Sequence, residues 1–286
     1  MKLGIFAKTF PGGIDENMAA VAAAGIRAVQ YNLSIAGIDT VPGHIPPGTL
    51  DTIAQASARH GVELAAISGT FNTAHPDPQV RGAGIARFPV LAAAAAELGI
   101  PVITLSSGSR NPDDMWQHHP DNSTPQAWQD SRSSLEQLAV IAENTGVTIA
   151  FEPEHTNVVS TAALARTMLD EVGSDRLKIV FDAANLLDTA DLSSTTMTAV
   201  IDRALDLLGP DLALAHAKEL VVGRAQVAPG EGVLPWQHII DRLAAVNYTG
   251  AVVTHGLPAA GVPIAVDTLT PLIEAETAVP TSNRSM

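Results

Sequence analysis

Acidic and imidazole side chains follow four consecutive apolar segments in the second half of the chain. Glu152 follows residues 147–151, Asp182 follows 177–181, His216 follows 212–215 and His255 follows 251–254. Carboxylates and imidazoles bind divalent metals and transfer protons near neutral pH. Because a buried carboxylate needs a cation, a hydrogen-bond donor or a proton, these residue types at successive segment ends predict one shared site.

Each of the four residues also has a structural interpretation when it is taken alone. Glu152 could form a salt bridge, and Asp182 could cap a following helix. His216 could be a hydrogen-bonded core histidine, and His255 could face solvent. Their recurrence at four strand ends favours a metal site, and mixed oxygen and nitrogen ligands suit Mn²⁺, Fe²⁺, Co²⁺ or Zn²⁺ better than Ca²⁺.

The elements that would position these residues are predicted by periodicity. The four residues are separated by 30, 34 and 39 positions (182−152, 216−182, 255−216), each about one strand-helix unit. Strands are predicted at 2–7, 26–31, 62–67, 101–105, 147–151, 177–181, 212–215 and 251–254. Helices are predicted at 17–24, 50–59, 87–98, 128–145, 161–172, 194–208, 236–246 and 266–276.

Eight alternating units of this kind indicate an α/β fold, and continuous apolar strands indicate a parallel sheet buried on both faces. The count of eight favours a closed (β/α)8 TIM barrel, in which all strand C-terminal ends lie on one rim. We expect a single domain over 1–276 and a frayed polar tail over 277–286.

Composition excludes several classes of function. The 286 residues carry a net charge of −14, which disfavours nucleic acid and anionic membranes as partners. The chain has no cysteine, so disulfides and thiolate chemistry are excluded. The N-terminal residues predict a strand and not a signal peptide, and no phosphate-binding glycine motif follows it. A cytoplasmic location is therefore expected.

Other polar residues near the predicted rim are candidates for substrate binding. The connections 69–84 and 106–125 are long enough to form lids. The candidates are Gln30, Asn32, His75, Trp116, Glu154, His155 and Arg224. Lys218 stands two positions after His216, and residues two apart on a strand point to the same side, so we expect both side chains to face the same way. Lys218 could hold an oxyanion or neutralise Glu152.

Several of these segments together resemble a known group of enzymes. They are Phe151-Glu-Pro-Glu, Val180-Phe-Asp-Ala-Ala-Asn, His216-Ala-Lys-Glu, Pro229-Gly-Glu-Gly-Val-Leu-Pro-Trp and Tyr248-Thr-Gly-Ala-Val-Val-Thr-His. The chain resembles the xylose isomerase-like superfamily, and in particular its sugar phosphate isomerase/epimerase branch. The resemblance covers nearly the whole chain, although its motifs do not specify a substrate.

The resemblance implies one divalent metal, Mn²⁺ first, with Co²⁺, Mg²⁺, Fe²⁺ or Zn²⁺ as alternatives. In that family the ligands are Glu, Asp, His and a second Glu, which match Glu152, Asp182, His216 and His255. The chain departs from the family pattern at His255, where the family has Glu, and at Asn185, where a D-x-x-H pattern has His. Asn185 is included among the substrate-binding candidates.

The leading functional hypothesis is isomerisation or epimerisation of a sugar or sugar-like polyol. Glu152 would remove the proton α to a carbonyl, the metal and Lys218 would hold the enediolate, and His255 would return a proton. If His255 binds the metal, Glu154 or His155 would return it instead.

The alternative hypothesis is a lyase or dehydratase acting on a keto-sugar or keto-glycoside through the same metal site. An abasic-site endonuclease and a non-catalytic accessory barrel are further alternatives. A small carbohydrate is the expected partner, and a homodimer is the usual state of such barrels.

Overall fold

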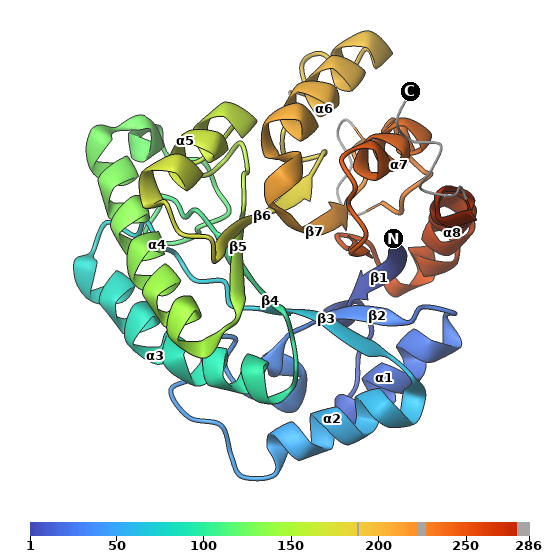
Figure 1. Cartoon of the computed structure of the whole chain (residues 1–286), viewed down its shortest axis with the longest axis horizontal. Coiled ribbons are helices and arrows are strands. Elements are labelled where there is room, and N and C mark those ends of the chain that lie inside the picture. The colour runs from blue at the N-terminus through green and yellow to red at the C-terminus, as the bar shows by residue number, and fades with distance from the viewer. Residues whose placement is uncertain (188, 222–226, 279–286) are drawn as a thin grey trace.

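The chain forms a closed barrel of parallel strands in the order β1 to β8, with β8 hydrogen-bonded to β1 (Figure 1). The computed structural model describes residues 1–187, 189–221 and 227–278. The strands are β1 (Lys2–Phe6), β2 (Ala28–Tyr31), β3 (Glu63–Ser68), β4 (Val102–Ser106), β5 (Thr148–Glu152), β6 (Leu177–Asp182), β7 (Leu212–Ala217) and β8 (Ala251–Thr254). The predicted single-domain (β/α)8 barrel is confirmed.

Eight helices surround the barrel in the part of the chain that the structure describes (Figure 1). They are α1 (Ile14–Ala23), α2 (Thr49–His60), α3 (Pro78–Glu97), α4 (Pro125–Thr145), α5 (Ala162–Val172), α6 (Ser194–Leu208), α7 (Trp236–Ala245) and α8 (Val262–Ala278). Their apolar faces pack on the outer side of the strands in two large buried clusters. Each strand is therefore buried on both sides, which explains the continuous apolar runs in the sequence.

The barrel interior is filled by small and branched residues that determine where the functional side chains point. One buried cluster joins Ala28, Ala66, Val102, Ala150, Val180, Leu214 and Val253, which come from seven strands. Because side chains alternate along a strand, the residue two positions later faces the barrel axis again, nearer its C-terminal rim. These later residues are Gln30, Ser68, Thr104, Glu152, Asp182, His216 and His255. The hydrophobic packing thus aims every candidate ligand at the axis.

Four predicted helix starts were late, those of α1 and α4 by three residues and those of α3 and α8 by more. α3 begins at Pro78 and not at residue 87, because the Asp77 side chain accepts a hydrogen bond from the Gln79 N–H (2.8 Å) and Pro78 occupies the first helical turn. Such an N-cap offsets the low helix propensity of the glycines that follow it. The predicted connection 69–84 therefore ends at residue 77.

α8 begins at Val262 and not at residue 266, with a proline again in its first turn, and it extends to Ala278. The predicted boundary at residue 276 thus falls inside this helix. Residues 279–286 of the predicted tail lie outside the described residues. The connection 106–125 is irregular as predicted, apart from one 3₁₀ turn at Pro120–Ser123.

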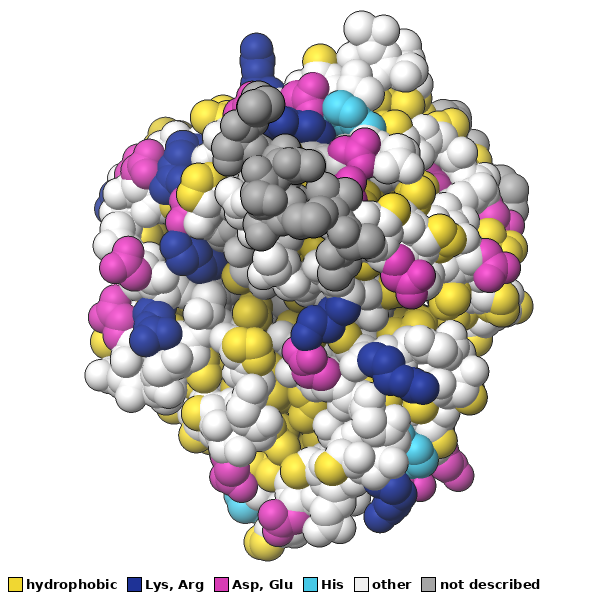
Figure 2. All heavy atoms as spheres, turned by 45° about the vertical axis from the view of Figure 1, so that its right-hand side comes forward, with side chains coloured by type: hydrophobic (Ala, Val, Ile, Leu, Met, Phe, Trp, Pro, Cys, Tyr) yellow, Lys and Arg dark blue, Asp and Glu magenta, His cyan; other side chains and the backbone are white. Residues whose placement is uncertain are grey.

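On the face of the molecule in Figure 2, lysine and arginine side chains are scattered among acidic ones and form no continuous basic stripe. Within the described residues, no helix is both long and apolar enough to cross a membrane.

Candidate metal centre

The C-terminal ends of β5 to β8 bring four metal-binding side chains together. One potential ligand atom from each of Glu152, Asp182, His216 and His255 lies within 4.8 Å of the others. His216 Nδ1 is 3.2 Å from Glu152 Oε1, and His255 Nε2 is 3.2 Å from Asp182 Oδ2. The two imidazole rings are 4.4 Å apart between their centroids. The predicted convergence is confirmed, whereas metal binding by these four residues stays a prediction.

The hydrogen bonds of Gln30 determine which nitrogen of His216 faces the centre. The Gln30 amide NH₂ donates to Ser68 Oγ and Thr104 Oγ1, both at 3.1 Å. Its carbonyl oxygen, Oε1, therefore faces His216 Nε2 at 2.7 Å. An amide oxygen only accepts hydrogen bonds, so Nε2 carries the hydrogen of the neutral ring and Nδ1 presents its lone pair.

This tautomer creates a local arrangement that fits a cation. The His216 Nδ1 lone pair faces Glu152 Oε1 at 3.2 Å, and that oxygen already accepts a hydrogen bond from Asn185 Nδ2 (2.7 Å). Two acceptors at this separation repel each other unless a proton or a metal ion lies between them. A donor set of two carboxylates and two imidazoles suits a divalent transition metal. The residues present therefore fit the ion that the sequence predicts.

Burial and charge shift the pKa values of the cluster in a consistent way. Desolvation, reinforced by the negative charge of Asp182, raises the pKa of Glu152 to about 7. Desolvation also lowers the pKa of His216 to about 4. Burial alone would raise the pKa of Asp182, but the hydrogen bond and charge of His255, together with Lys218, lower it. The cluster thus disfavours two negative carboxylates at once until positive charge arrives.

Metal uptake is expected to weaken as pH falls through about 7. Below its raised pKa of about 7, Glu152 carries a proton that an incoming ion must displace. His216 is already neutral in this range because its pKa is lowered to about 4. Calorimetry in buffers of different protonation enthalpy should detect about one more proton released per ion at about pH 6 than at about pH 8. Glu152→Gln should lose most of this difference, and equal release at both pH values would contradict the assignment.

A cavity of about 740 Å³ opens above the centre. It is lined on one side by ionisable groups from β5, β7 and β8 and the connections after them: Glu152, Glu154, His216, Lys218, Glu219 and His255. Lys8, after β1, is a further ionisable residue of the lining. It is lined on the other side by uncharged polar groups from β2 to β4 and the connections after them: Gln30, Asn32, Thr40, Ser68, Thr70 and Thr104. Apolar surface comes from residues such as Phe6, Leu105 and Trp116. A concave, mostly apolar cavity with converging polar groups is typical of a small-molecule site.

Asn185 and Gln30 line this cavity but use their polar atoms within the protein. Asn185 donates from Nδ2 to Glu152 and accepts at Oδ1 from Lys218 Nζ (2.8 Å). Gln30 bonds His216, Ser68 and Thr104, as described above. Both were predicted to bind substrate. Substrate binding by these two residues stays a prediction, and in this structure their side chains hydrogen-bond Glu152 and His216.

The remaining predicted residues divide into those inside and those outside the cavity. Trp116, which is 51% exposed, and Glu154 line it. His75 is a turn residue outside the lining, because its Nδ1 accepts from the Asp77 N–H (3.0 Å) and its Nε2 contacts Pro112 O (3.3 Å). His155 is exposed and is also outside the lining. Arg224 lies outside the described residues.

Sequence reasoning missed several residues of the cavity. Ser68 is the last residue of β3 and Thr104 is the middle residue of β4, and both are only 4% exposed. Strand alternation could have indicated both residues, because each stands two positions after a residue that faces the barrel interior. Lys8, Thr40 and Thr70 also line the cavity, but they lie in connections, where no periodicity indicates orientation.

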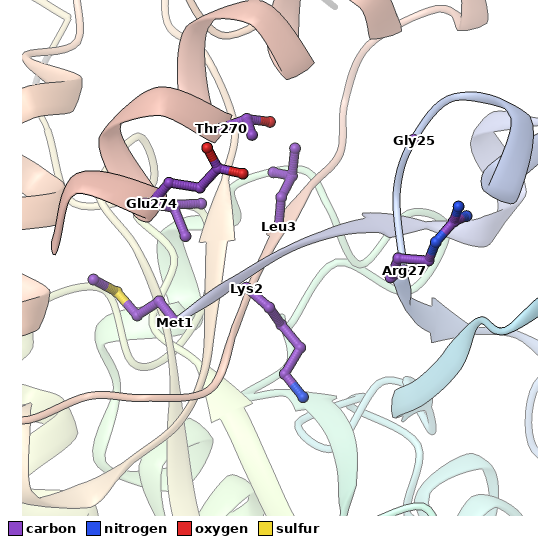
Figure 3. A pocket seen from close by; sticks show the side chains of 8 residues that line it. Met1, Lys2, Leu3, Gly25, Arg27, Thr270 and Glu274 are labelled. Carbon is purple, nitrogen blue, oxygen red and sulfur yellow. The ribbon is translucent and has the colours of Figure 1, made fainter. Parts of the chain in front are cut away.

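A second cavity of about 530 Å³ lies at the start of β1, beside α8 (Figure 3). Figure 3 shows the Lys2 and Arg27 side chains pointing in different directions there, and not toward a common centre. Among the described residues, the only group of three or more potential metal ligands is the one formed by β5 to β8.

Comparisons with known proteins agree with this architecture. The chain is 32% identical over 123 residues to a D-psicose 3-epimerase from Enterocloster bolteae, a match covering 42% of this chain and 37% of that relative. It is 27% identical over 213 residues to the D-psicose 3-epimerase of Agrobacterium fabrum, covering 71% of this chain and 68% of the relative. The crystal structure of 3-keto-D-glucoside 4-epimerase from E. coli superimposes with a TM-score of 0.74 at 21% identity, covering 95% of this chain and 98% of that one.

The first of these matches spans little more than a third of that relative, so it says nothing about the remainder. A family model, however, matches residues 18–275, which include every strand from β2 to β8 and all four clustered side chains. By fold, by motif and by this match, the chain belongs to the xylose isomerase-like TIM barrel family.

Proposed function

We propose that this protein is a divalent-metal-dependent isomerase or epimerase of a sugar or sugar-like polyol. The observation that carries the proposal is the convergence of Glu152, Asp182, His216 and His255 within 4.8 Å at the floor of a 740 Å³ cavity. Relatives that are D-psicose 3-epimerases support a small carbohydrate as the substrate.

The four clustered side chains would hold the ion, with Mn²⁺ as the first candidate. When bound, the ion would polarise the substrate carbonyl and a neighbouring hydroxyl group as a Lewis acid. Glu152 would remove the proton on the carbon next to the carbonyl, because its side chain lines the cavity and is 15% exposed there. Asn185 holds this carboxylate in place through its hydrogen bond to Oε1. Lys218 would stabilise developing negative charge on oxygen.

Return of the proton determines whether the reaction is an epimerisation. An epimerase must deliver the proton to the opposite face of the carbon, which requires a second acid. His255 lines the cavity, and its Nε2 is occupied by Asp182, so Nδ1 is the nitrogen available for this role. Glu154 also lines the cavity, and desolvation raises its pKa to about 7, so it is the candidate if His255 serves only as a ligand.

A lyase or dehydratase acting on a keto-sugar is a second candidate. His255 and Asn185 stand where the family has Glu and His, and both are directly involved in the cluster. Elimination needs the same α-proton removal but no proton return to the opposite face. Product analysis by NMR separates the two reactions, because only elimination gives an unsaturated product.

The proposal is tested by metal content and by proton exchange. Protein purified without added metal should contain about one divalent ion per chain by mass spectrometry, as a single mononuclear site holds, and Asp182→Asn should contain far less. The native protein with Mn²⁺ should then exchange the α-proton of a ketose or 3-keto-glycoside with solvent deuterium. Phosphorylated and unphosphorylated substrates are both needed in the panel. Absence of a bound ion, with no exchange on any sugar, would refute the proposal.

A further inference from the structure

In the described parts of the β7–α7 connection, residues 218–221 and 227–235, the backbone surrounds one buried carboxylate, that of Glu219. This side chain is 7% exposed. Oε1 accepts the N–H groups of Leu220 (2.9 Å) and Leu234 (3.1 Å). Oε2 accepts the N–H of Gly230 (2.9 Å) and the indole N–H of Trp236 (2.8 Å). The carboxylate thus binds both ends of a connection that leaves β7 and returns to the start of α7.

All four of these donors are uncharged, and among the described residues no ion pair to Glu219 is found. A buried carboxylate without a cation is costly unless several N–H groups solvate it. Four donors aimed at two oxygens meet that requirement. An amide could not replace the carboxylate, because it has only one oxygen and its NH₂ group would face two other donors.

Two glycines let the backbone approach Glu219. A Cβ atom on Gly232 would lie 2.5 Å from Glu219 Cδ and 2.4 Å from the Leu220 carbonyl oxygen. Gly230 has a positive φ of +99°, and a Cβ there would lie 2.3 Å from Thr268 Oγ1. The Leu220 carbonyl also accepts the Val233 N–H at 3.2 Å. The motif from Pro229 to Trp236 therefore has the composition that wrapping around this carboxylate requires.

The residue that this arrangement positions is Lys218, the immediate neighbour of Glu219. Lys218 Nζ donates to Asn185 Oδ1 (2.8 Å), and Asn185 Nδ2 donates to Glu152 Oε1 (2.7 Å). Lys218, Glu219 and Leu220 all line the main cavity. The stem of Lys218 passes Gly256, where an added Cβ would be 3.5 Å from its Cγ. Fixing the backbone after Lys218 thus fixes the start of a chain of contacts that ends at Glu152.

We propose that Glu219 is a positioning residue whose buried carboxylate holds residues 218–221 against residues 230–236, so that Lys218 reaches Asn185 and the reacting substrate oxygen. Its effect on turnover rests on the proposed function, whereas its effect on the Lys218 side chain does not. Glu219 contributes no ligand atom to the metal cluster, so its loss leaves the donor set intact.

The first test measures the accessibility of Lys218 without any turnover. The native protein is treated briefly with acetic anhydride, and the labelling of Lys218 relative to exposed Lys8 is measured by mass spectrometry. Glu219→Gln should raise this ratio several-fold, because Lys218 no longer remains bonded to Asn185. The matched control is Glu231→Gln in the same connection, whose exposed carboxylate accepts one backbone N–H, that of Ala228. An unchanged ratio in Glu219→Gln would overturn the proposal.

The second test is a double-mutant cycle in kcat. With metal saturating, Glu219→Gln should lower kcat about tenfold with little change in KM, since a misplaced charge affects mainly the transition state. If Glu219 acts through Lys218, the same substitution should have almost no further effect in a Lys218→Met background. Equal losses in both backgrounds would show a general structural role and overturn the proposal.

Folding and function are separated by two further measurements. If Glu219→Gln shows no cooperative unfolding transition and is therefore not natively folded, Gly232→Ala provides a second variant. Its added methyl group would push the backbone at residue 232 away from Glu219, whose carboxylate is unchanged. It should give the same rise in Lys218 labelling. If the native protein turns over no sugar, the proposed function fails, yet the labelling ratio still decides whether Glu219 positions Lys218.

Discussion

Glu152→Gln is expected to lower kcat by about a thousandfold or more, within the range that loss of a general base produces. Glutamine has nearly the same shape, and its amide oxygen could still accept the hydrogen bond from Asn185 Nδ2. It cannot take a proton from carbon. The measurement is solvent deuterium incorporation into the substrate, with the divalent metal at saturating concentration so that weaker metal binding does not contribute.

The control for this variant is Glu63→Gln. Glu63 is another strand glutamate, but it is half exposed and paired with Lys2 at 2.6 Å, remote from the cavity lining. That variant should retain native kcat. If Glu152→Gln kept more than about a tenth of native exchange under saturating metal, the base would have to be another residue, and Glu154 would be the first to test.

Gly108→Ala is expected to cause the largest loss of stability from a single methyl group. Gly108 has a positive φ of +78°, and an added Cβ would lie 2.4 Å from the Ala74 backbone nitrogen and 2.7 Å from Asn72 Oδ1. Its carbonyl accepts the Val158 N–H (2.9 Å), so it joins the connections after β3, β4 and β5. Backbone strain and overpacking together should cost about 3 kcal/mol or more, measured by denaturant unfolding.

Gly99→Ala separates the two contributions. Gly99 has a similar φ of +67°, but nothing lies within 4 Å of the added Cβ. This variant should lose only about 1 kcal/mol, the cost of the backbone conformation. If both alanine variants were equally stable, the close approach at Gly108 would carry no energetic weight. Gly108→Ala should also raise KM, because the connection after β4 carries Met115 and Trp116 of the cavity lining.

The convergence of the four side chains could be predicted because each of them is indicated by the sequence pattern of its own strand. Glu152 and Asp182 are the last residues of β5 and β6, and His216 is next to last in β7. Eight units of similar length place such strand ends on one rim. Asp182 and His216 follow this rule without help from tertiary contacts. The helix starts at Pro78 and Val262 were missed because a capping carboxylate and a proline in the first turn outweighed the low propensity of the residues nearby.

The hydrogen-bond partners within the site could not be predicted in the same way. Gln30 and His216 are 186 positions apart in the sequence, and only closure of the barrel places the amide against the ring. The sequence likewise does not show that Asn185 accepts a hydrogen bond from Lys218 and donates one to Glu152. His75 lies outside the cavity lining, and the sequence does not show this because a turn histidine and a rim histidine have the same local sequence pattern.

The division of the cavity between ionisable groups from β5, β7 and β8 and uncharged polar groups from β2 to β4 has an evolutionary consequence. Under the proposed function, mutations on the uncharged side, at Asn32, Thr40 or Thr70, should change which hydroxyl pattern is accepted without removing a proposed proton-transfer group. Selection for a new sugar would then act on the uncharged side, while the proposed reaction would be retained by the ionisable groups of the other side. Gln30 is the exception, because its bond to His216 crosses from one half to the other. Libraries for altered specificity should vary the first half of the chain and leave Gln30 unchanged.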